Sequence, residues 1–279
     1  CLMGMRINTN TQALAAQRTL ARTSGAQQSS LEKLSSGTRI VRSADDAAGL
    51  AVAEKMKAEI RSVRQAVRNA NDGISIVQAT EGGLNEITNI MMRFRELSIQ
   101  AASDTIGDVE RGFINKEVTQ LTAEIDHIAD SIEFNGRIKL MNGQGDPVQI
   151  QIGINNTDED RFTIQQSDID ARTVTLGLEG FNINSKEAAQ NNLDKIDWAI
   201  NTLSEKRAIL GAIHNRLECS IRNLQVYDEN LSGARSRIYD VDMASETAEL
   251  VKNNVLSQTG VSLLAQANQN PVQALKLLG

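Results

Sequence analysis

The feature that most constrains the fold is the proline-free stretch 35–87, in which apolar residues recur at alternating spacings of three and four. This spacing is that of a and d positions in heptads, typical of a helix that buries one stripe against other helices. We therefore expect one helix from Asp45 to Ala101, about 85 Å long at 1.5 Å per residue. The stripe consists of Ile60, Val63, Val67, Ala70, Ile74, Val77 and Leu84, and continues through Ile87, Met91, Phe94 and Leu97.

Residues that start and stop helices set the limits of this long helix. Ser43, Asp45 and Asp46 supply N-cap candidates and carboxylates for a first turn, where the helix dipole favours negative charge. Asp45 and Asp46 also suggest an acid–base pair, but no base, cleft or ligand set accompanies them, so we interpret them as capping residues. After a break near Gly107, apolar residues at the same spacing predict a second helix from Ile114 to Ile132.

In the middle of the chain, the spacing of apolar residues changes from a helical pattern to alternation. The segment "VQIQIGI" alternates, "NNTDED" predicts a turn and "RFTIQQ" predicts the returning strand of a β-hairpin. The segment "TVTLGLEGFNI" predicts one further strand. Helical spacing then returns from Leu193 to Leu231, followed by a last helical segment from Val255 to Leu278.

The two ends of the chain resemble each other in character. The first arm has sparse apolar residues such as Leu14, Leu20, Leu31 and Leu34 among uncharged polar ones, and the last segment needs a partner of matching kind. We expect a mainly α protein, a long antiparallel helical bundle or coiled coil built from both chain ends, with a small β-hairpin region around residues 142–190. Residues 5–44 and 238–279 form a terminal coiled-coil domain, and residues 45–237 form a rod domain. Weak arms of this kind are suited to folding on assembly with copies of the same chain.

Composition excludes several classes of function. The net charge is −6 and aromatic residues make up 3% of the chain, without the basic stripe and interleaved aromatics of a nucleic-acid-binding protein. We expect no membrane insertion, catalytic residue, cofactor or metal site, so the chain is not predicted to be an enzyme. The segment "EGGLNEI" lacks the preceding strand and the lysine of a phosphate-binding loop. Cys219 lies beside an apolar helical stripe and is interpreted as a small residue at a helix–helix contact.

Eight segments together resemble bacterial flagellin. They are "RINTNTQALAAQR", "LEKLSSGTRIVRSADDAAGLA", "RNANDGISIVQATEGGLNEI", "RFRELSIQAAS", "IEFNGRIKL", "LGAIHNRLECSIRNL", "ARSRIYDVDMASETAEL" and "SLLAQANQNP". The resemblance implies a secreted structural protein, in a short form without large outer domains, that self-assembles into the extracellular filament of the bacterial flagellum for motility. It implies that the paired termini form the innermost tube and the long helices the next one. It also implies type III export, with the export apparatus, an export chaperone and the filament cap as partners.

Two further readings stay open at this point. The hook–filament junction protein shares the terminal helices, and a coiled-coil adaptor or chaperone would bind the helices of other proteins. An adaptor should stop at a small oligomer, whereas a filament subunit should grow into long tubes.

Two sets of residues are assigned to interactions. By resemblance, Toll-like receptor 5 docks on Arg93, Glu96, Leu97 and Glu117, with Met92 where many recognised flagellins carry glutamine. The apolar positions expected to carry assembly are Leu31, Leu34, Ile60, Val67, Ile74, Leu217, Leu224, Leu263, Leu264 and Leu275.

Overall fold

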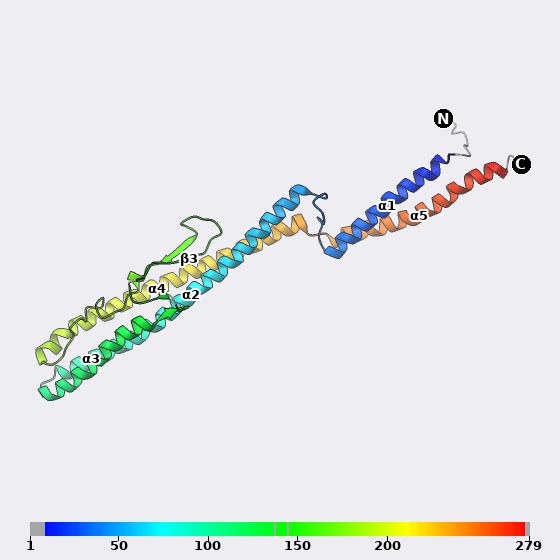
Figure 1. Cartoon of the computed structure of the whole chain (residues 1–279). Coiled ribbons are helices and arrows are strands. Elements are labelled where there is room, and N and C mark those ends of the chain that lie inside the picture. Colours follow the sequence, from blue (N-terminus) through cyan, green and yellow to red (C-terminus); the bar gives the residue numbers. More distant parts are fainter. Residues whose placement is uncertain (1–8, 137, 144, 277–279) are drawn as a thin grey trace. The chain divides into compact units, whose positions relative to one another are not determined.

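The protein was analysed as a computed structural model, which describes residues 9–136, 138–143 and 145–276 and, within these ranges, all side chains except those of 138 and 270–276. Its helices are α1 (Thr11–Ser36), α2 (Ala47–Ala101), α3 (Asp108–Ser131), α4 (Lys186–Tyr239) and α5 (Met243–Lys276). The strands are β1 (Glu133–Phe134), β2 (Ile138–Lys139), β3 (Val148–Gln151) and β4 (Arg161–Ile164), and a 3-10 turn η1 spans Gln166–Asp168. The predicted mainly α fold with a small β region is confirmed (Figure 1).

The chain divides into two compact units, which we call the terminal unit (1–58 and 230–279) and the central unit (59–229). In the terminal unit α1 and α5 lie side by side (Figure 1). They are antiparallel, because Asn10 at the start of α1 donates to the carbonyl of Ala267 (2.7 Å), whereas Thr38 after α1 pairs with Asp240 before α5.

The central unit is built on α2, which lies antiparallel to both α3 and α4. Arg64, Glu81 and Arg95 of α2 form ion pairs with Asp228, Arg207 and Asp197 of α4, so residue numbers fall in α4 as they rise in α2. The apolar stripe predicted from the sequence forms the core, and the side chains of Leu84, Met91, Phe94 and Leu97 are at most 1% exposed. Phe94 stacks on Phe181 with ring centroids 5.3 Å apart.

The long helix begins next to the aspartates that were predicted to cap it. Asp46 Oδ1 accepts from the backbone N–H of Gly49 (2.8 Å), and Asp45 Oδ2 accepts from the N–H groups of Val41 and Arg42. These backbone hydrogen bonds lower the pKa of Asp45. The interpretation of Asp46 as a capping residue is therefore confirmed, whereas Asp45 is not a cap, because it binds the backbone of the turn that precedes the helix.

The predicted hairpin is present as β3 and β4, which pair antiparallel with Val148 opposite Ile164 and Gln151 opposite Arg161. It packs on α2 through Ile150, which lies against Gly73, and on α4 through Arg216, whose guanidinium lies 4.8 Å from the ring centroid of Phe162. A second, shorter hairpin joins β1 to β2 through Asn135 and Gly136, both with positive φ.

The prediction of a strand in "TVTLGLEGFNI" is wrong. Residues 173–183 form turns, and Gly177 and Gly180 adopt the left-handed conformation (φ 66° and 69°), which interrupts a strand. Their apolar neighbours are buried on the helices, including Leu176, Leu178 and Ile183. The alternating pattern therefore reports which side chains of an irregular segment are buried, not strand pairing.

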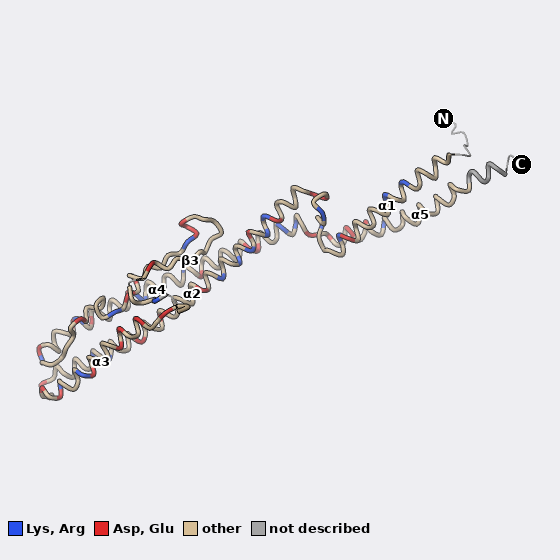
Figure 2. Tube along the Cα trace, in the orientation of Figure 1, with Lys and Arg blue, Asp and Glu red and all other residues tan. Residues whose placement is uncertain are grey.

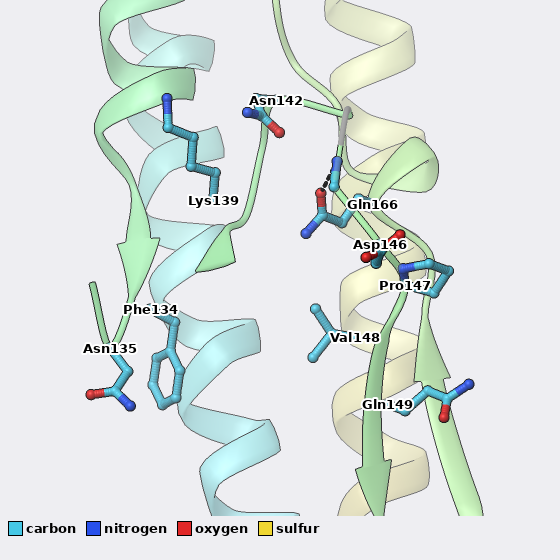
Figure 3. Close-up of a pocket in the computed structure, with 10 residues that line it drawn as sticks. Phe134, Asn135, Lys139, Asn142, Asp146, Pro147, Val148, Gln149 and Gln166 are labelled. Atoms are coloured by element: carbon cyan, nitrogen blue, oxygen red, sulfur yellow. Dashed lines mark hydrogen bonds between the residues drawn. The ribbon is translucent and has the colours of Figure 1, made fainter. Parts of the chain in front are cut away.

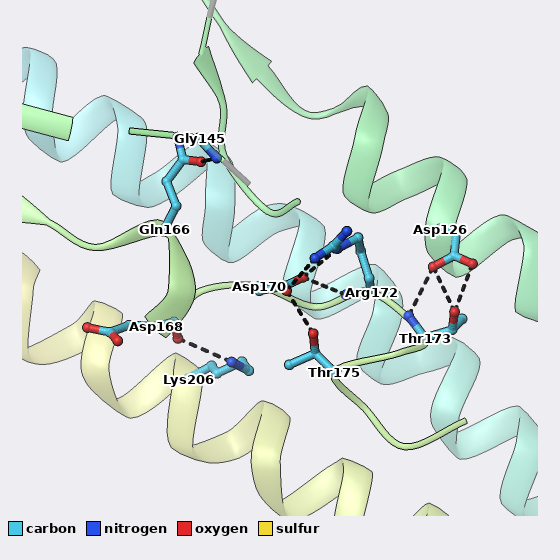
Figure 4. A network of polar contacts seen from close by, with 9 residues as sticks. All are labelled: Asp126, Gly145, Gln166, Asp168, Asp170, Arg172, Thr173, Thr175 and Lys206. Atoms are coloured by element: carbon cyan, nitrogen blue, oxygen red, sulfur yellow. Dashed lines mark hydrogen bonds and ion pairs between the residues drawn. The ribbon is translucent and has the colours of Figure 1, made fainter. Parts of the chain in front are cut away.

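A network of polar contacts holds this irregular segment in place (Figure 4). Asp126 of α3 accepts from the backbone N–H (2.9 Å) and the hydroxyl of Thr173, and Asp170 accepts from Arg172 and from the hydroxyl of Thr175 (2.7 Å). From α4, the ammonium of Lys206 reaches the carbonyl of Asp168 at 3.4 Å, and burial lowers the pKa of this lysine. Carboxylates thus replace the missing strand ladder as hydrogen-bond partners of the segment.

Two glycines in α2 give a matched test of this packing. A methyl group added at Gly73 would lie 2.7 Å from Cδ1 of Ile150 and 3.3 Å from Cδ1 of Leu217, whereas one at Gly82 meets nothing within 4 Å. Gly82→Ala should raise the free energy of unfolding by about 0.5–1 kcal/mol, the usual gain in helix propensity. Gly73→Ala should instead lower it, because overpacking costs about 1–3 kcal/mol. Urea unfolding of both variants checks the opposite signs; a stabilised Gly73→Ala would contradict the described contact with Ile150.

Asp170 gives the central unit an acid-sensitive contact. Burial alone raises the pKa of Asp170, but the hydrogen bonds from Arg172 and Thr175 and the charge of Arg172 outweigh it, so the pKa lies below the ordinary 3.8. A carboxylate with a lowered pKa contributes stability above its unfolded pKa and loses it as pH falls through the folded value. Between pH 7 and pH 2, the wild-type protein should lose more stability below about pH 4 than Asp170→Asn, which is already less stable at pH 7. Parallel pH profiles of the two proteins in urea would contradict this role.

Candidate assembly and recognition surfaces

The contact between α1 and α5 is made mostly of small and polar residues, with two leucines on each helix. Residues of low or intermediate exposure recur at spacings of three and four on both helices, the spacing of a two-helix seam. Within the described part of the two helices, only Ser30, Asn253 and Ala267 are buried. The seam residues are Ala13, Ala16, Leu20, Thr23, Gln27, Ser30 and Leu34 on α1, and Glu246, Leu250, Asn253, Ser257, Gly260, Leu264 and Ala267 on α5.

Large apolar side chains of the same two helices point away from the seam. Leu14 and Leu31 of α1 are 52% and 49% exposed. In α5, Met243 at its start is 52% exposed, and five leucine and valine residues are 48–59% exposed, namely Val251, Val255, Leu256, Val261 and Leu263. At about 100° per residue these five spread over several sides of α5, whereas α1 covers only one. A helix that is apolar on most sides is normally buried by several neighbours, so the terminal unit presents more apolar surface than its own chain covers.

The assembly residues predicted in the terminal unit fall into two groups. Leu31 and Leu263 are exposed, and Leu263 reaches 55%. Leu34 and Leu264 are half-buried at seam positions. The side chain of Leu275 lies outside the described residues.

In the central unit the predicted assembly residues serve the fold of their own chain. Leu217 is fully buried and Ile60 is 8% exposed, while Val67, Ile74 and Leu224 are half-buried. Leu217 belongs to the hydrophobic core of the central unit and Ile74 packs against it, as the heptad spacing predicts. The role of the five residues in assembly stays a prediction.

The segments that lead into and out of the terminal helices pair with each other, which the sequence analysis did not predict. The backbone N–H of Arg39 donates to the carbonyl of Tyr239 (2.7 Å), and its guanidinium donates twice to the carbonyl of Ile238. The N–H of Val241 in turn donates to the carbonyl of Gly37 (3.1 Å). Because the partners are about 200 residues apart in the chain, no local pattern identifies them.

Arg93 is the centre of an exposed charged cluster on α2 and α3. Its guanidinium lies 3.0 Å from Oε2 of Glu96 and 2.9 Å from Oε1 of Glu117, and both carboxylates raise the pKa of Arg93. The three side chains are 44–68% exposed, so they are accessible to a partner. Met92 beside them is 49% exposed.

Leu97 does not belong to this exposed cluster. Its side chain is 1% exposed and packs in the core of the central unit. Its burial separates Leu97 from the other residues that the resemblance assigned to the receptor, because a spacing of four leaves enough rotation for Arg93 to face α3 and Leu97 the core. Of the four residues, only Arg93, Glu96 and Glu117 are accessible.

Cys219 is also placed differently from its interpretation. It is exposed on α4 rather than packed at a helix–helix contact. The histidines are each beside a glutamate on their own helix, His127 near Glu124 and His214 near Glu218. Among the described residues, no group of three or more possible metal ligands is found.

A cavity of about 770 Å³ lies between the two hairpins (Figure 3). Its lining contains the amides of Asn135, Asn142, Gln149 and Gln166, and Gln166 accepts from the N–H of Gly145 at 2.8 Å. Lys139 and Asp146 are the charged residues of this lining. Amide side chains both donate and accept, so the cavity suits a peptide backbone or ordered water.

In the part of the chain that the structure describes, no helix is both long enough and apolar enough to cross a membrane.

Comparisons with known proteins agree on one family. The sequence model of the bacterial flagellin N-terminal helical region matches residues 7–146, and that of the C-terminal helical region matches residues 193–278. A flagellin of Halalkalibacterium halodurans is 43% identical over 98% of this chain and 100% of its own length. A flagellin of Bacillus subtilis is 41% identical, and flagellin FlaB2 of Treponema pallidum 42%, over the same shares.

Among solved structures, a flagellar hook-associated protein of Vibrio parahaemolyticus matches with TM-score 0.57 and 12% identity, over 70% of this chain and 100% of its own. Identity this low shows a common fold and nothing more. Bacillus cereus flagellin is 31% identical, with TM-score 0.49, over 56% of this chain and 88% of its own. From the family matches at both ends and the full-length relatives, the chain belongs to the bacterial flagellin family.

Proposed function

We propose that this chain is the structural subunit of a bacterial flagellar filament and that it polymerises through its terminal helices. The observation that carries the proposal is the terminal unit, in which small and polar residues make up most of the seam while seven leucine and valine side chains of α1 and α5 are exposed. Membership of the flagellin family supports the same function, and that family is structural rather than enzymatic.

The physical argument concerns what the exposed apolar side chains require. Burying one leucine or valine side chain contributes about 1.5–3 kcal/mol, and α5 alone exposes five of them. A pair of helices with so little internal core gains most of its stability from packing against other helices. In a homopolymer the only abundant source of matching helices is the same surface on neighbouring copies.

The positions of the two parts of the chain in the filament follow from this argument. We place the paired termini, residues 5–44 and 238–279, in the innermost tube, where every exposed side of α5 meets a neighbour. Residues 45–237 form the next tube, with the hairpin region around 142–190 in place of large outer domains. The filament lies outside the cell and the subunit reaches it by flagellar type III export, with an export chaperone and the filament cap as further partners.

The alternatives predict different assemblies. A hook–filament junction protein has the same fold, but no feature of the described residues favours it over a filament subunit. A coiled-coil adaptor should stop at a small oligomer. Electron microscopy of purified protein under polymerising conditions separates these cases, because long tubes of uniform diameter are expected only from a filament subunit.

Removing either arm tests the role of the terminal unit. Deletion of residues 1–40 or 240–279 should leave the central unit folded, because its core lies within residues 76–217. The same deletions should abolish polymerisation. Sedimentation measures polymer and circular dichroism measures helix content; tubes from either truncated protein would contradict the proposal.

Point variants test the exposed apolar residues without removing a helix. Val255→Ser and Leu263→Ser change side chains that are 55% exposed, so the melting temperature of the monomer should stay unchanged. Each should raise the critical concentration for polymerisation by about tenfold, because the loss of about 1.4 kcal/mol is a factor of ten. Lys195→Ala on α4 is the control and should polymerise as the wild type does.

We also propose that Toll-like receptor 5 binds the charged cluster of Arg93, Glu96 and Glu117 when the subunit is not part of a filament. Arg93→Ala should lower the affinity of the monomer for the receptor ectodomain by at least about 2 kcal/mol, the usual value for an interface anchor. Leu97→Ala should act differently, because removal of a buried leucine destabilises the monomer by about 2–5 kcal/mol. Binding and thermal unfolding of both variants check this; equal binding by wild type and Arg93→Ala would reject the receptor contact.

A further inference from the structure

The central unit carries unused charges of opposite sign at two separate places. On α3, Glu110, Glu117 and Glu124 follow one another at intervals of seven residues and are all exposed; we call them the acidic stripe. On α2, Arg61 and Arg68 are also exposed and seven residues apart; we call them the basic pair. Residues seven apart lie on one face of a helix at a distance of about 10 Å, so the two sets match in spacing. Figure 2 shows the acidic residues along α3.

Neither set is fully neutralised within the part of the chain that the structure describes. Among the described residues, Arg61 and Glu110 form no ion pair, and Arg68 donates only to the side-chain oxygen of Gln65. Glu124 lies 3.6 Å from His127, which is charged only when protonated. Only Glu117 has an arginine partner, Arg93, and it shares that arginine with Glu96.

Distance prevents the two sets from meeting inside one copy. Glu117 is level with Arg93 of α2, to which it is bound, and Arg61 precedes Arg93 by 32 positions in the same helix. At 1.5 Å per residue this places Arg61 roughly 48 Å, and Arg68 roughly 38 Å, from the level of Glu117. A second copy that lies alongside the first and is displaced by a distance of this order along the helix axis would bring its own basic pair beside the stripe.

We propose that the acidic stripe of one subunit docks on the basic pair of the next, as a head-to-tail contact between central units. The proposal rests on the proposed filament function and names one of its interfaces. Because the two surfaces differ, the contact does not close on itself and each new copy exposes a fresh stripe or pair, which produces an open chain. Opposite charges also fix how the two subunits align along their helices. Because the stripe and the basic pair both repeat every seven residues, two ion pairs between the subunits can form at the same time.

The surroundings of the stripe fit such a contact. Phe113 lies three residues after Glu110 and four before Glu117, hence on the same side of α3, and is 63% exposed. The ammonium of Lys116 lies 5.6 Å from the centroid of this ring. The stripe therefore combines carboxylates with an apolar side chain that docking would remove from water.

Charge reversal tests the contact. Arg68→Glu and Glu110→Arg should each raise the critical concentration for polymerisation by at least about tenfold, with the melting temperature of the monomer unchanged. Lys195→Glu on α4 makes the same change at an exposed lysine without an ion pair among the described residues, and should polymerise as the wild type does. Arg68→Glu combined in turn with Glu110→Arg, Glu117→Arg and Glu124→Arg identifies the register, because the true partner restores assembly to within about threefold.

Mixing separates contacts between copies from effects inside one copy. Arg68→Glu protein mixed with protein carrying the restoring substitution on α3 should polymerise where neither does alone, because the reversed surfaces of the two proteins match each other. Failure of all three double variants and of the mixtures would overturn the contact while wild-type tubes uphold the proposed function. Absence of tubes from the wild-type protein would overturn both.

Discussion

Burial of the apolar stripe of α2 against α3 and α4 is the interaction on which the central unit depends. Fully buried residues such as Leu84, Met91 and Leu203 come from helices that are each too extended to form a core alone. The stripe must therefore be shared between segments far apart in the chain, and the chain must return on itself. The antiparallel ion pairs of α2 with α4 follow from that return and fix its register on the surface.

The terminal unit applies the same heptad spacing with different chemistry. Serine, threonine, glutamine, asparagine and glycine occupy seam positions, so α1 and α5 meet without burying much apolar surface. Four leucines lie at the seam, but seven further leucines and valines, which could stabilise a coiled coil, are exposed instead. A helix pair of this composition is weak in the free subunit and gains stability when neighbours cover it.

In the central unit, the buried polar contacts and the exposed ones have different roles. Asp126 and Asp170 are used to hold an irregular segment on the helices, where their hydrogen bonds replace a strand ladder. The exposed charges of the acidic stripe and the basic pair have no such task within one chain, apart from the ion pair of Glu117 with Arg93. Exposed ion pairs such as Arg93–Glu117 contribute little to stability, typically 0–1 kcal/mol, so their arrangement is better explained by contacts with other molecules than by the fold.

The sequence by itself determined the helices, the main hairpin and the family. Heptad spacing from Ile60 to Leu97 is a local property of the chain and translates directly into a buried helical stripe. Capping by Asp46 and alternation in "VQIQIGI" are local as well, and so were predicted correctly. The eight flagellin-like segments are specific because they combine many such positions.

Tertiary structure alone decided which side chains remain exposed. Leu97 is buried and Cys219 is exposed, because each depends on where α3 and α4 lie around α2. The turns at 173–183 formed instead of a strand because Asp126, distant in the sequence, accepts the hydrogen bonds of Thr173. The outward position of Leu263 and the separation of the acidic stripe from the basic pair are likewise properties of packed helices. The spacing of apolar residues predicts that a helix has a buried face, but the positions of the neighbouring helices decide how wide that face is.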